Sequence, residues 1–566
     1  VTFCGRSGTS VRLRYGEMCR GDGTLYTANL RSAANTDIYT MKGGEEIFVP
    51  SFTSHGFRYV EITGNGFTLT ADEAKRLVVS VEGLVVTNTA ETAGHFECSN
   101  KAVNRLQSCI EWGQRGNSLL VFTDCPQRNE RMGWTGDAQV FAKTAAYNMY
   151  IKPFMDKWLT DLRDAQLMYN RGGAVPDTAP LGGDNRAHGG CAGWGDAAAI
   201  VPWEMYMAYG DISVLEDNYD MMRAWVEERS TNVNFGMRVV DGKEVPDQSD
   251  LASEPYIQKQ PPRGDHLAFD ETTPFILSAT AYAARVAEIV SDTARLLGRG
   301  DDAARYEALH KKIVRAFREA WVCDDGSIAY WGEMSKNGCD AKGNIINRTR
   351  YGEGCASGAS QTAYALAIDF GLIPEEKLAH AAECFKRAID DRGGRLSVGF
   401  LGISHLLPAL EKAGLTDTAF ALLECDENPS WLYSVKNGAT TIWERWDSYV
   451  AETDTFGDVS MNSFNHYAYG AVGEWMFGTI LGINAAEPGY RRIVLRPVPG
   501  GTLTYAKGSY ESAAGFIYSE WRISGDKFIY RCKIPANAEA ELYLPGRSEP
   551  VMLESGRHEY IVNLQN

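Results

Sequence analysis

The densest group of ionisable side chains lies between Thr123 and Asp137. Pro126, Gly133 and Gly136 preclude a continuous helix, so these side chains should project from a loop. Buried-type residues such as Cys125 lie among them, which favours a cleft in which crowded carboxylates have shifted pKa values. A solvated surface loop is the alternative. The charged and aromatic side chains of the segment are Asp124, Arg128, Glu130, Arg131, Trp134 and Asp137.

A second carboxylate suited to catalysis lies far along the chain, in the stretch from Gly438 to Asp447. Glu444 lies between Trp443 and Trp446, where loss of water would make it a better base than an exposed carboxylate. The alternative is a surface glutamate paired with Arg445. Two carboxyl groups flanking a glycosidic oxygen are what glycoside hydrolysis requires, so the sequence points to that chemistry.

Three further residues are ambiguous when taken alone. Trp194 either stacks on the apolar face of a sugar or anchors a core. Asp196 precedes an apolar, helix-like run and is first of all a good helix N-cap. His466 lies in a polar cluster, Asn462–Tyr467, and serves either structure or catalysis.

Composition excludes several partners and cofactors. The 566 residues carry a formal net charge of −17, which argues against nucleic acid and anionic membranes as partners. No apolar run reaches the roughly 18 residues of a membrane-spanning helix. The nine histidines do not cluster at metal-ligand spacing, and no nucleotide-binding or serine-nucleophile motif occurs, so we expect neither metal nor cofactor. The twelve cysteines form no CxxC pair, which argues against a zinc ribbon or redox motif. As scattered, reduced thiols they favour a cytosolic setting, with a secreted or periplasmic protein as the alternative.

Periodicity divides the chain into three expected domains: residues 1–92, 93–482 and 483–566. The first and last alternate polar and apolar residues with Gly and Asn turns, as antiparallel β-sandwich domains do. The middle part has helical spacing, and a dozen helices match a barrel of six helical hairpins, with a helical solenoid as the alternative. Because Val1 already lies in a strand-like run and is not Met, we expect the chain to begin inside a larger β domain.

The expected elements are as follows. Strands are predicted at 11–15, 46–49, 57–62, 76–86, 492–496, 502–509, 515–523, 527–534, 539–544 and 558–564. After a helix capped by Ser99 and Asn100, further helices are predicted at 137–150, 152–169, 197–209, 213–229, 274–297, 301–320, 360–371, 375–390, 402–413, 416–424 and 465–481.

The sequence resembles the bacterial α-L-rhamnosidases, inverting exo-glycosidases with an (α/α)₆ barrel between antiparallel β-sandwich domains. The resemblance runs from near the start of the chain to near its end. Its most specific part is the Asp-Cys-Pro-Gln-Arg string that begins at Asp124 and continues to Asp137. The other matching segments are Ser54–Tyr59, Gly193–Asp196, Thr441–Trp446 and Asn465–His466.

The resemblance implies a role for each candidate residue. Glu130 is the general acid that protonates the departing oxygen, and Glu444 is the general base that activates water. Inversion requires the two carboxyl groups about 6.5–9.5 Å apart, so we expect Glu130 and Glu444 to lie in this range or slightly beyond it. The implied contacts to the sugar are Asp124, Arg128, Trp134, Asp137, Trp194 and His466.

The expected substrate is therefore a terminal, non-reducing α-L-rhamnose on a glycoside or oligosaccharide. The sequence does not decide whether the protein forms a homodimer through its β domains. Two other readings remain: a rhamnose-binding relative without turnover, and a barrel enzyme or lyase acting on another glycan. A lyase would need a Tyr/His or Arg pair beside a uronate, and no such cluster stands out.

Overall fold

The computed structural model describes residues 1–169, 172–182, 189–231, 237–240, 243–246, 256–258, 263–271, 273–329, 359–547 and 549–564. Their contacts divide the chain into two compact units. Unit 1 comprises Val1–Thr89, Cys109–Met132 and Ala439–Tyr467. Unit 2 comprises Ala90–Ser108, Gly133–Gly438 and Ala468–Asn566.

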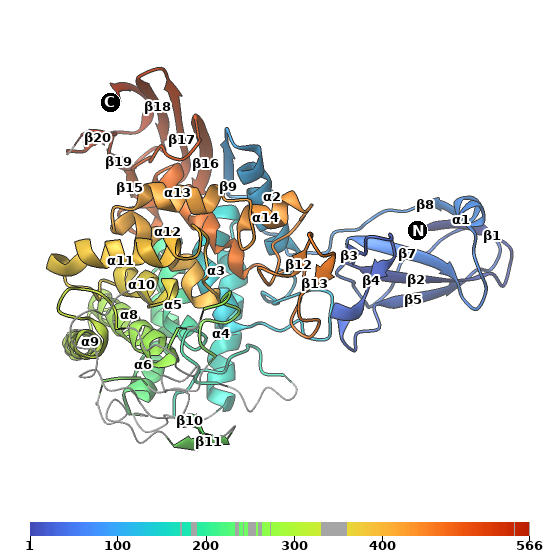
Figure 1. The fold of residues 1–566 in the computed structure, drawn as a ribbon, viewed down its shortest axis with the longest axis horizontal. Coiled ribbons are helices and arrows are strands. Elements are labelled where there is room, and N and C mark those ends of the chain that lie inside the picture. Colours follow the sequence, from blue (N-terminus) through green and yellow to red (C-terminus); the bar gives the residue numbers. More distant parts are fainter. Residues whose placement is uncertain are drawn as a thin grey trace. The chain divides into compact units, whose positions relative to one another are not determined.

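The first 89 residues of unit 1 form two three-stranded antiparallel sheets, ordered β6-β1-β8 and β5-β2-β7, and a hairpin of β3 and β4 (Figure 1). Alternation along β2 buries Val11 and Leu13, which share one apolar cluster with Phe3 of the other sheet. The strands are β1 (Thr2–Gly5), β2 (Ser10–Gly16), β3 (Met18–Cys19), β4 (Leu25–Tyr26), β5 (Thr36–Thr40), β6 (Gly44–Ile47), β7 (Tyr59–Gly64) and β8 (Val78–Ser80).

The long strand predicted at 76–86 is wrong. Its beginning belongs to helix α1 (Ala71–Leu77), and only Val78–Ser80 is a strand. Thr70 and Glu73 form a capping box, in which each side chain accepts a hydrogen bond from the other residue's backbone N–H. This cap satisfies the first free amides of the helix and outweighs the strand-like composition that follows.

The helices of the middle region follow the predicted spans closely, and Asn100 caps the first of them through the backbone amides of Ala102 and Val103. The long helices α8 and α9 lie side by side in unit 2 (Figure 1). The helices are α2 (Lys101–Gly116), α3 (Thr135–Asn148), α4 (Lys152–Tyr169), α5 (Ala197–Tyr209), α6 (Ser213–Thr231), α8 (Phe275–Leu296), α9 (Gly300–Trp321), α10 (Gln361–Asp369), α11 (Leu378–Asp390), α12 (Phe400–Lys412), α13 (Thr416–Glu424) and α14 (Trp431–Lys436). A hairpin of β10 (Met237–Val240) and β11 (Lys243–Pro246) also occurs in unit 2.

The helix predicted at 465–481 is broken. A 3₁₀ segment (Ala468–Val472), one α turn (Gly473–Trp475) and a π segment (Met476–Ile480) replace it. The hydroxyl of Thr144 enters this stretch: it donates to the carbonyl of Ala471 and accepts from the amide of Glu474. A side chain inserted into the backbone hydrogen bonds opens a helix at that point.

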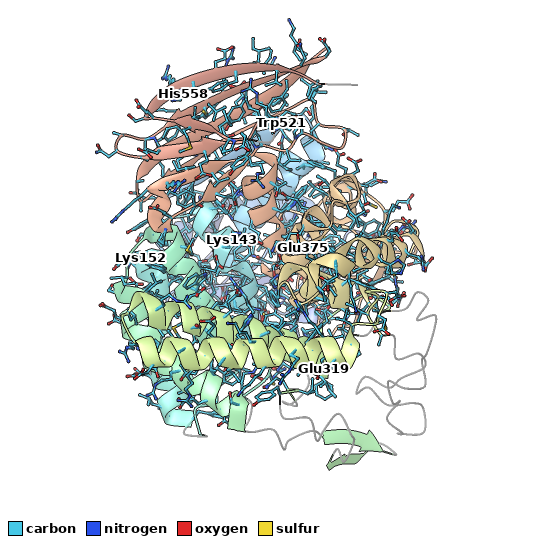
Figure 2. The ribbon with its side chains drawn as sticks, turned by 90° about the vertical axis from the view of Figure 1, so that its left-hand side faces the viewer. Lys143, Lys152, Glu319, Glu375, Trp521 and His558 are labelled. Carbon is cyan, nitrogen blue, oxygen red and sulfur yellow. The ribbon has the colours of Figure 1, made fainter. Side chains whose placement is uncertain are left out.

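The C-terminal residues form two sheets, ordered β21-β18-β17-β16-β9 and β14-β15-β19-β20. The strands are β9 (Gly94–Cys98), β14 (Ile483–Ala485), β15 (Arg492–Leu495), β16 (Tyr505–Ser512), β17 (Gly515–Ser524), β18 (Lys527–Ile534), β19 (Glu539–Leu542), β20 (Val551–Leu553) and β21 (Gly556–Asn563). Trp521, labelled in Figure 2, donates from its indole N–H to the carbonyl of Ile480 at 2.7 Å and so ties β17 to the π segment.

Two features of these sheets differ from the expected antiparallel domain. β15 and β19 pair in parallel. The segment between them contains the β16–β18 meander and is long enough for the crossover that a parallel pair requires. β9, which precedes the helices, completes the five-stranded sheet beside β16. In the described part of the chain, no helix combines the length and apolarity needed to cross a bilayer.

Candidate active site

The loop predicted to carry the chemistry is closed at its two ends in unit 1. The backbone amide of Asp124 donates to the carbonyl of Met132 at 3.0 Å, and the amide of Met132 donates to Asp124 Oδ1 at 2.8 Å. Arg131 lies at φ 56°, a left-handed backbone conformation that turns the chain before it returns. The closed loop therefore brings the side chains between Asp124 and Met132 together.

Arg128 is the centre of the group, with 1% of its side chain exposed. Its Nη1 and Nη2 atoms donate to the two oxygens of Glu444, each at 2.9 Å. Its Nε and Nη2 atoms contact Glu130 Oε2 at 3.0 and 2.7 Å. Burial alone would lower the pKa of the guanidinium, but the charges of Glu444 and Glu130 outweigh burial and raise it.

Glu444 is fixed by backbone pairing as well as by Arg128. Its amide donates to the carbonyl of Ser463 at 2.9 Å, and the amide of His466 donates to the carbonyl of Ile442 at 2.8 Å. Residues 442–444 and 463–466 therefore hold each other, which explains why two polar clusters of the sequence belong to one site. Glu444 is buried, so it is not the surface glutamate of the alternative interpretation.

Arg128 also sets the distance between the two glutamates. Glu130 Oε2 and Glu444 Oε1 lie 2.7 and 2.9 Å from the same Nη2 atom. These two oxygens are therefore no farther apart than the sum of the two contacts. For these two atoms, the prediction of a separation within or slightly beyond the inverting range is wrong, because both carboxylates bind the same guanidinium.

Asp124 lies in the same buried group. Burial, and next the charge of Glu130, raise the pKa of Asp124 to about 8, while His466 and Arg128 act in the opposite direction. Its Oδ2 atom is 3.8 Å from Arg128 Nη2. Unit 1 thus brings together five of the predicted residues: Asp124, Arg128, Glu130, Glu444 and His466.

Three residues from the connections between the N-terminal strands, Glu17, Asn29 and Arg31, join this group, and sequence reasoning did not find them. Arg31 Nη1 lies 2.9 Å from Glu130 Oε2. Glu17 accepts from the amide of Phe464 and from the side chain of Asn29. No motif surrounds these residues, and more than 400 positions separate Glu17 from Phe464, so no local signal could have indicated them.

The remaining predicted residues belong to unit 2. The guanidinium carbon of Arg263 lies 4.6 Å from the ring centre of Trp134 and 5.7 Å from that of Trp194. Arg263 is held by Asp177 at 2.8 Å. Trp194 is buried, and its indole N–H has no hydrogen-bond partner among the described residues. A side chain at Gly136 would lie within 2.7 Å of the Trp194 ring, so glycine allows this close approach.

Asp137 lies in the first turn of α3, as predicted, where the helix N-terminus favours a carboxylate. The prediction for Asp196 is wrong in its mechanism. Asp196 precedes α5 but makes no side-chain capping bond to it. Its buried carboxylate instead accepts from Trp225 at 2.9 Å, from Arg229, and from the amide of Gly193 at 2.7 Å.

A metal ion has one conceivable site among the described residues. Single ligand atoms of Asp124, Cys125 and Glu130 lie within 4.8 Å of one another. Arg128 already supplies positive charge there, and burial raises the pKa of the Cys125 thiol, which would have to lose its proton to bind a metal. This set does not favour a metal, and the expectation of a metal-free site stays a prediction.

Comparison with known proteins identifies the family that the sequence resembles, and the matches extend over most of the chain. Residues 91–480 match the bacterial α-L-rhamnosidase 6 hairpin glycosidase domain, residues 482–559 the C-terminal domain and residues 1–85 the concanavalin-like domain of these proteins. An α-L-rhamnosidase of Streptomyces avermitilis is 41% identical over 96% of this chain and 46% of its own length. One of Formosa agariphila is 37% identical over 95% of this chain and 53% of its own.

Two solved structures are also similar. The Streptomyces avermitilis α-L-rhamnosidase in complex with L-rhamnose aligns with a TM-score of 0.83 and 39% identity, over 100% of this chain and 50% of that one. The native Aspergillus terreus α-L-rhamnosidase aligns with a TM-score of 0.81 and 32% identity, over 99% and 60%. The chain thus spans about half the length of the curated relatives it matches.

The chain thus carries a helical 6 hairpin glycosidase domain, preceded and followed in the sequence by β-rich regions of the same class of proteins. Within that class, the chain belongs to the bacterial α-L-rhamnosidase family.

Proposed function

We propose that the protein is an exo-acting α-L-rhamnosidase that releases terminal, non-reducing α-L-rhamnose from glycosides or oligosaccharides by an inverting mechanism. The observation that carries the proposal is the pair Glu130 and Glu444 on one nitrogen of the buried Arg128. The family assignment and the L-rhamnose bound by the Streptomyces relative support the choice of sugar.

In this mechanism, Glu130 gives a proton to the glycosidic oxygen as the bond between that oxygen and the anomeric carbon breaks. Glu444 takes a proton from a water molecule, whose oxygen forms the new bond to the anomeric carbon from the opposite face. The product is β-L-rhamnose and a free hydroxyl on the leaving group. The two hydrogen bonds from Arg128 stabilise Glu444 as the carboxylate, which is the form that a base requires.

Glu130 must carry a proton when it acts, and its surroundings supply one. Asp124 is buried beside it, and burial with the charge of Glu130 raises the pKa of Asp124 to about 8. Asp124 therefore carries a proton in the site at neutral pH. We propose that sugar hydroxyls engage Arg128 on binding and draw it from Glu130, which lets the proton of Asp124 pass to Glu130 and opens the space that water needs.

The remaining assignments follow from the family resemblance. Charge-assisted bonds from Asp124, Arg128 and Asp137 would hold the hydroxyls of rhamnose. Trp134 and Trp194 would form apolar walls, and the unpartnered indole N–H of Trp194 could donate to the sugar. His466 would complete the contacts.

The proposed architecture is an (α/α)₆ barrel over residues 93–482 between β-sandwich domains at 1–92 and 483–566. The helices of the middle region support it, since the consecutive helices α8 and α9 pack against each other. In this arrangement, the loops between pairs would supply the sugar-binding residues.

The experiment is hydrolysis of a natural rhamnoside, with proton NMR of the anomeric signal in the first minutes. The β anomer should appear first. Glu130→Gln and Glu444→Gln should each lower kcat by about 10²–10⁴-fold, as expected for loss of an acid or base. Glu61→Gln removes a surface glutamate paired with Arg14 and should leave kcat unchanged. Near wild-type turnover of a natural glycoside by Glu130→Gln would contradict the assignment of the acid.

A further inference from the structure

The N-terminal strands contact the loop that carries Glu130. Besides its contact with Glu130 Oε2 at 2.9 Å, Arg31 donates through Nε to the carbonyl of Ser460 at 2.7 Å. Next to it, Ser32 accepts from the side chain of Asn129 at 2.6 Å. Arg31 therefore links the loop of the proposed acid to the segment that precedes Asn462, all within unit 1.

The backbone of Arg31 indicates that this position is fixed by its surroundings. Its φ of 57° with ψ of −121° is unfavourable for a residue with a Cβ. Such a conformation persists only where neighbouring contacts impose it, and here Arg31 has contacts to Glu130, Ser460 and Met461.

A second set of contacts supports Glu444. Asn29 is buried and donates to Glu17 at 3.0 Å and to the carbonyl of Asn462 at 3.1 Å. Glu17 accepts from the amide of Phe464 at 3.1 Å. Asn462 and Phe464 flank Ser463, whose carbonyl accepts from the amide of Glu444. The N-terminal strands thus hold the backbone that carries the proposed base.

We propose that Arg31 is a positioning residue for Glu130, and that Glu17 and Asn29 are positioning residues for Glu444. This inference rests on the proposed function and extends it, because it makes the first 89 residues part of the catalytic unit. Arg31 acts by fixing the direction of the Glu130 carboxylate and by placing a positive charge beside it.

Two effects separate this role from general support of the fold. Loss of the Arg31 charge should move the alkaline limb of the kcat/KM–pH profile to higher pH, because a nearby cation favours the ionised form of an acid. Loss of its geometry should lower kcat more than it raises KM. Arg31→Met should lose both effects, whereas Arg31→Lys should keep the pH limb while losing part of kcat.

The experiment measures pH profiles of kcat and KM for Arg31→Met, Arg31→Lys and Glu17→Gln on a natural rhamnoside. Glu17→Gln keeps an acceptor for Phe464 and Asn29, so its kcat should stay within about threefold of wild type, while Glu17→Leu should lose at least tenfold. Arg14→Met is the matched control: Arg14 lies in the same strands, similarly exposed, and pairs with Glu61 at 2.8 Å.

A crystal structure of Arg31→Met gives a readout that does not depend on activity. We expect Glu130 Oε2 to leave its place on Arg128 while Arg128 and Glu444 stay paired. An unmoved Glu130, or a pH profile that shifts as much in Arg14→Met as in Arg31→Met, would overturn the inference even if the protein hydrolyses rhamnosides. Failure of wild-type protein to hydrolyse any rhamnoside would instead refute the proposed function.

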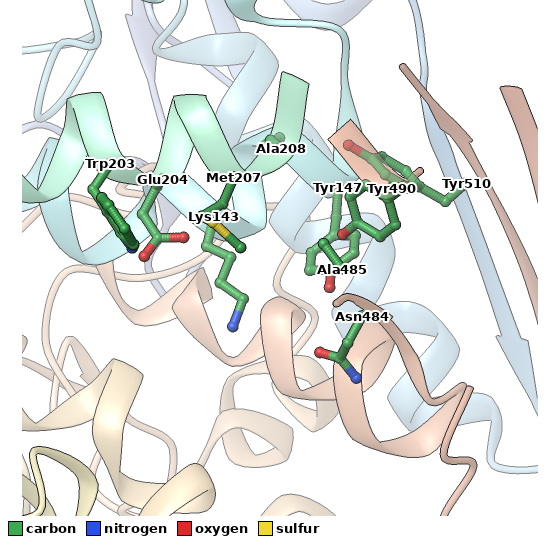
Figure 3. A pocket seen from close by; sticks show the side chains of 11 residues that line it. Lys143, Tyr147, Trp203, Glu204, Met207, Ala208, Asn484, Ala485, Tyr490 and Tyr510 are labelled. Atoms are coloured by element: carbon green, nitrogen blue, oxygen red, sulfur yellow. The ribbon is translucent and has the colours of Figure 1, made fainter. Parts of the chain in front are cut away.

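A separate cavity of about 200 Å³ lies in unit 2, and no predicted site residue lines it (Figure 3). α3 contributes Lys143 and Tyr147, and α5 contributes Trp203 and Glu204. The other side-chain walls are Met207, Asn484, Tyr490 and Tyr510. At about 30 Å³ per water, the space equals roughly six or seven water molecules, or one molecule of monosaccharide size.

Lys143 is the charged group of this cavity. Figure 3 shows its side chain between Glu204 on one side and Tyr147 and Asn484 on the other. The charge of Glu474, followed by that of Glu204, raises the pKa of Lys143 although burial opposes it. Its ammonium nevertheless makes no hydrogen bond and no ion pair within 4.0 Å to any residue in the described ranges. Lys143 is partly buried, and its ammonium has three donors that water or the hydroxyls of a ligand in the cavity can satisfy.

The lining indicates what such an acceptor would be. Tyr490 has a φ of 61°, a strained conformation for an aromatic residue, and its ring lies 5.0 Å from that of Tyr510. Aromatic walls, one lysine, a carboxylate and an amide provide donors and acceptors around apolar surface. Two glutamates beside one lysine disfavour an anion.

We infer that this cavity binds a neutral polyhydroxy molecule of monosaccharide size, whose hydroxyls accept from Lys143 and donate to Glu204. The probe is xylitol, measured by saturation-transfer NMR and by crystals soaked in it. The inference predicts electron density within hydrogen-bond distance of Lys143 Nζ, and at least tenfold weaker binding in Lys143→Met and Glu204→Leu. Lys152→Met, which removes a lysine paired with Asp156 and Asp211, should bind as wild type does. Water alone at Lys143 in saturated crystals, or unchanged binding in both cavity variants, would overturn it.

Discussion

Replacement of Arg128 by methionine gives the most direct test of the buried site. The change keeps a side chain of related length but removes the cation that contacts Glu444 through two hydrogen bonds and Glu130 through a third. Glu444 then loses this cation in the protein interior, whereas Glu130 keeps Arg31 at 2.9 Å. Side-chain exposure is 3% for Glu444 and 14% for Glu130, so Glu444 bears most of the loss.

The expected cost follows from these exposures. Removal of one partner of a buried ion pair destabilises a protein by about 3–5 kcal/mol, because the remaining charge is left without compensation. The free energy of unfolding should fall by that amount at pH 7.5. It should fall less at pH 5, since an orphaned carboxylate escapes much of the penalty when it binds a proton.

The assay is urea unfolding of wild type, Arg128→Met and Arg445→Met at both pH values, followed by tryptophan fluorescence. Arg445 is the control because it pairs with Asp447 at 2.8 Å, with 22% and 33% of the two side chains exposed. Exposed pairs of this kind contribute about 0–1 kcal/mol. Unfolding of Arg128→Met and Arg445→Met at the same urea concentration would show that Arg128 does not stabilise the buried charge of Glu444.

Three further predictions concern other buried groups. Burial raises the pKa of Glu17 to about 7, so the stability that its neutral form contributes is complete below about pH 4.5 and is lost as the pH rises through 7. In urea unfolding, Glu17→Gln should therefore be more stable than wild type above pH 7 and equal to it near pH 4.5. Arg229→Met should lower the free energy of unfolding by about 3–5 kcal/mol, because it leaves the buried carboxylate of Asp196 without its cationic partner. A double-mutant cycle should show that adding Asp196→Asn to Arg229→Met restores part of this stability. Cys125 is buried and burial raises the pKa of its thiol, so iodoacetamide at pH 8 should label the exposed Cys4 and spare Cys125 by peptide mass spectrometry.

Most helices could be predicted because their signal is local. The span predicted at 197–209 is α5, and the one at 213–229 is the greater part of α6, since apolar spacing and flanking Gly and Asp define both within one window. The broken helix after Ala468 could not be predicted in this way. Its cause is the hydroxyl of Thr144, a residue more than 300 positions away.

The same distinction applies to the site. Asp124, Arg128 and Glu130 could be grouped from the sequence because they share one short loop. Glu444 was singled out by its flanking tryptophans, but its role as the base came from the family resemblance. No local signal could place it beside Arg128, since only folding brings the two together across 316 positions. Arg31 could not be predicted from the sequence. It follows a 3₁₀ turn in a segment without a motif, and its proposed role depends on its contact with Glu130 Oε2.

The shared nitrogen of Arg128 couples the two proposed catalytic groups. Glu444 takes the edge formed by Nη1 and Nη2, and Glu130 takes the edge formed by Nη2 and Nε. A lysine could attract both carboxylates but could not assign each to its own edge, because an ammonium has no planar fork. Any ligand that turns the guanidinium therefore changes the surroundings of acid and base together. In the proposed reaction, a substrate that moves Arg128 would therefore change the hydrogen bonds of Glu130 and Glu444 at the same time. This fits a mechanism in which proton donation and water activation must coincide.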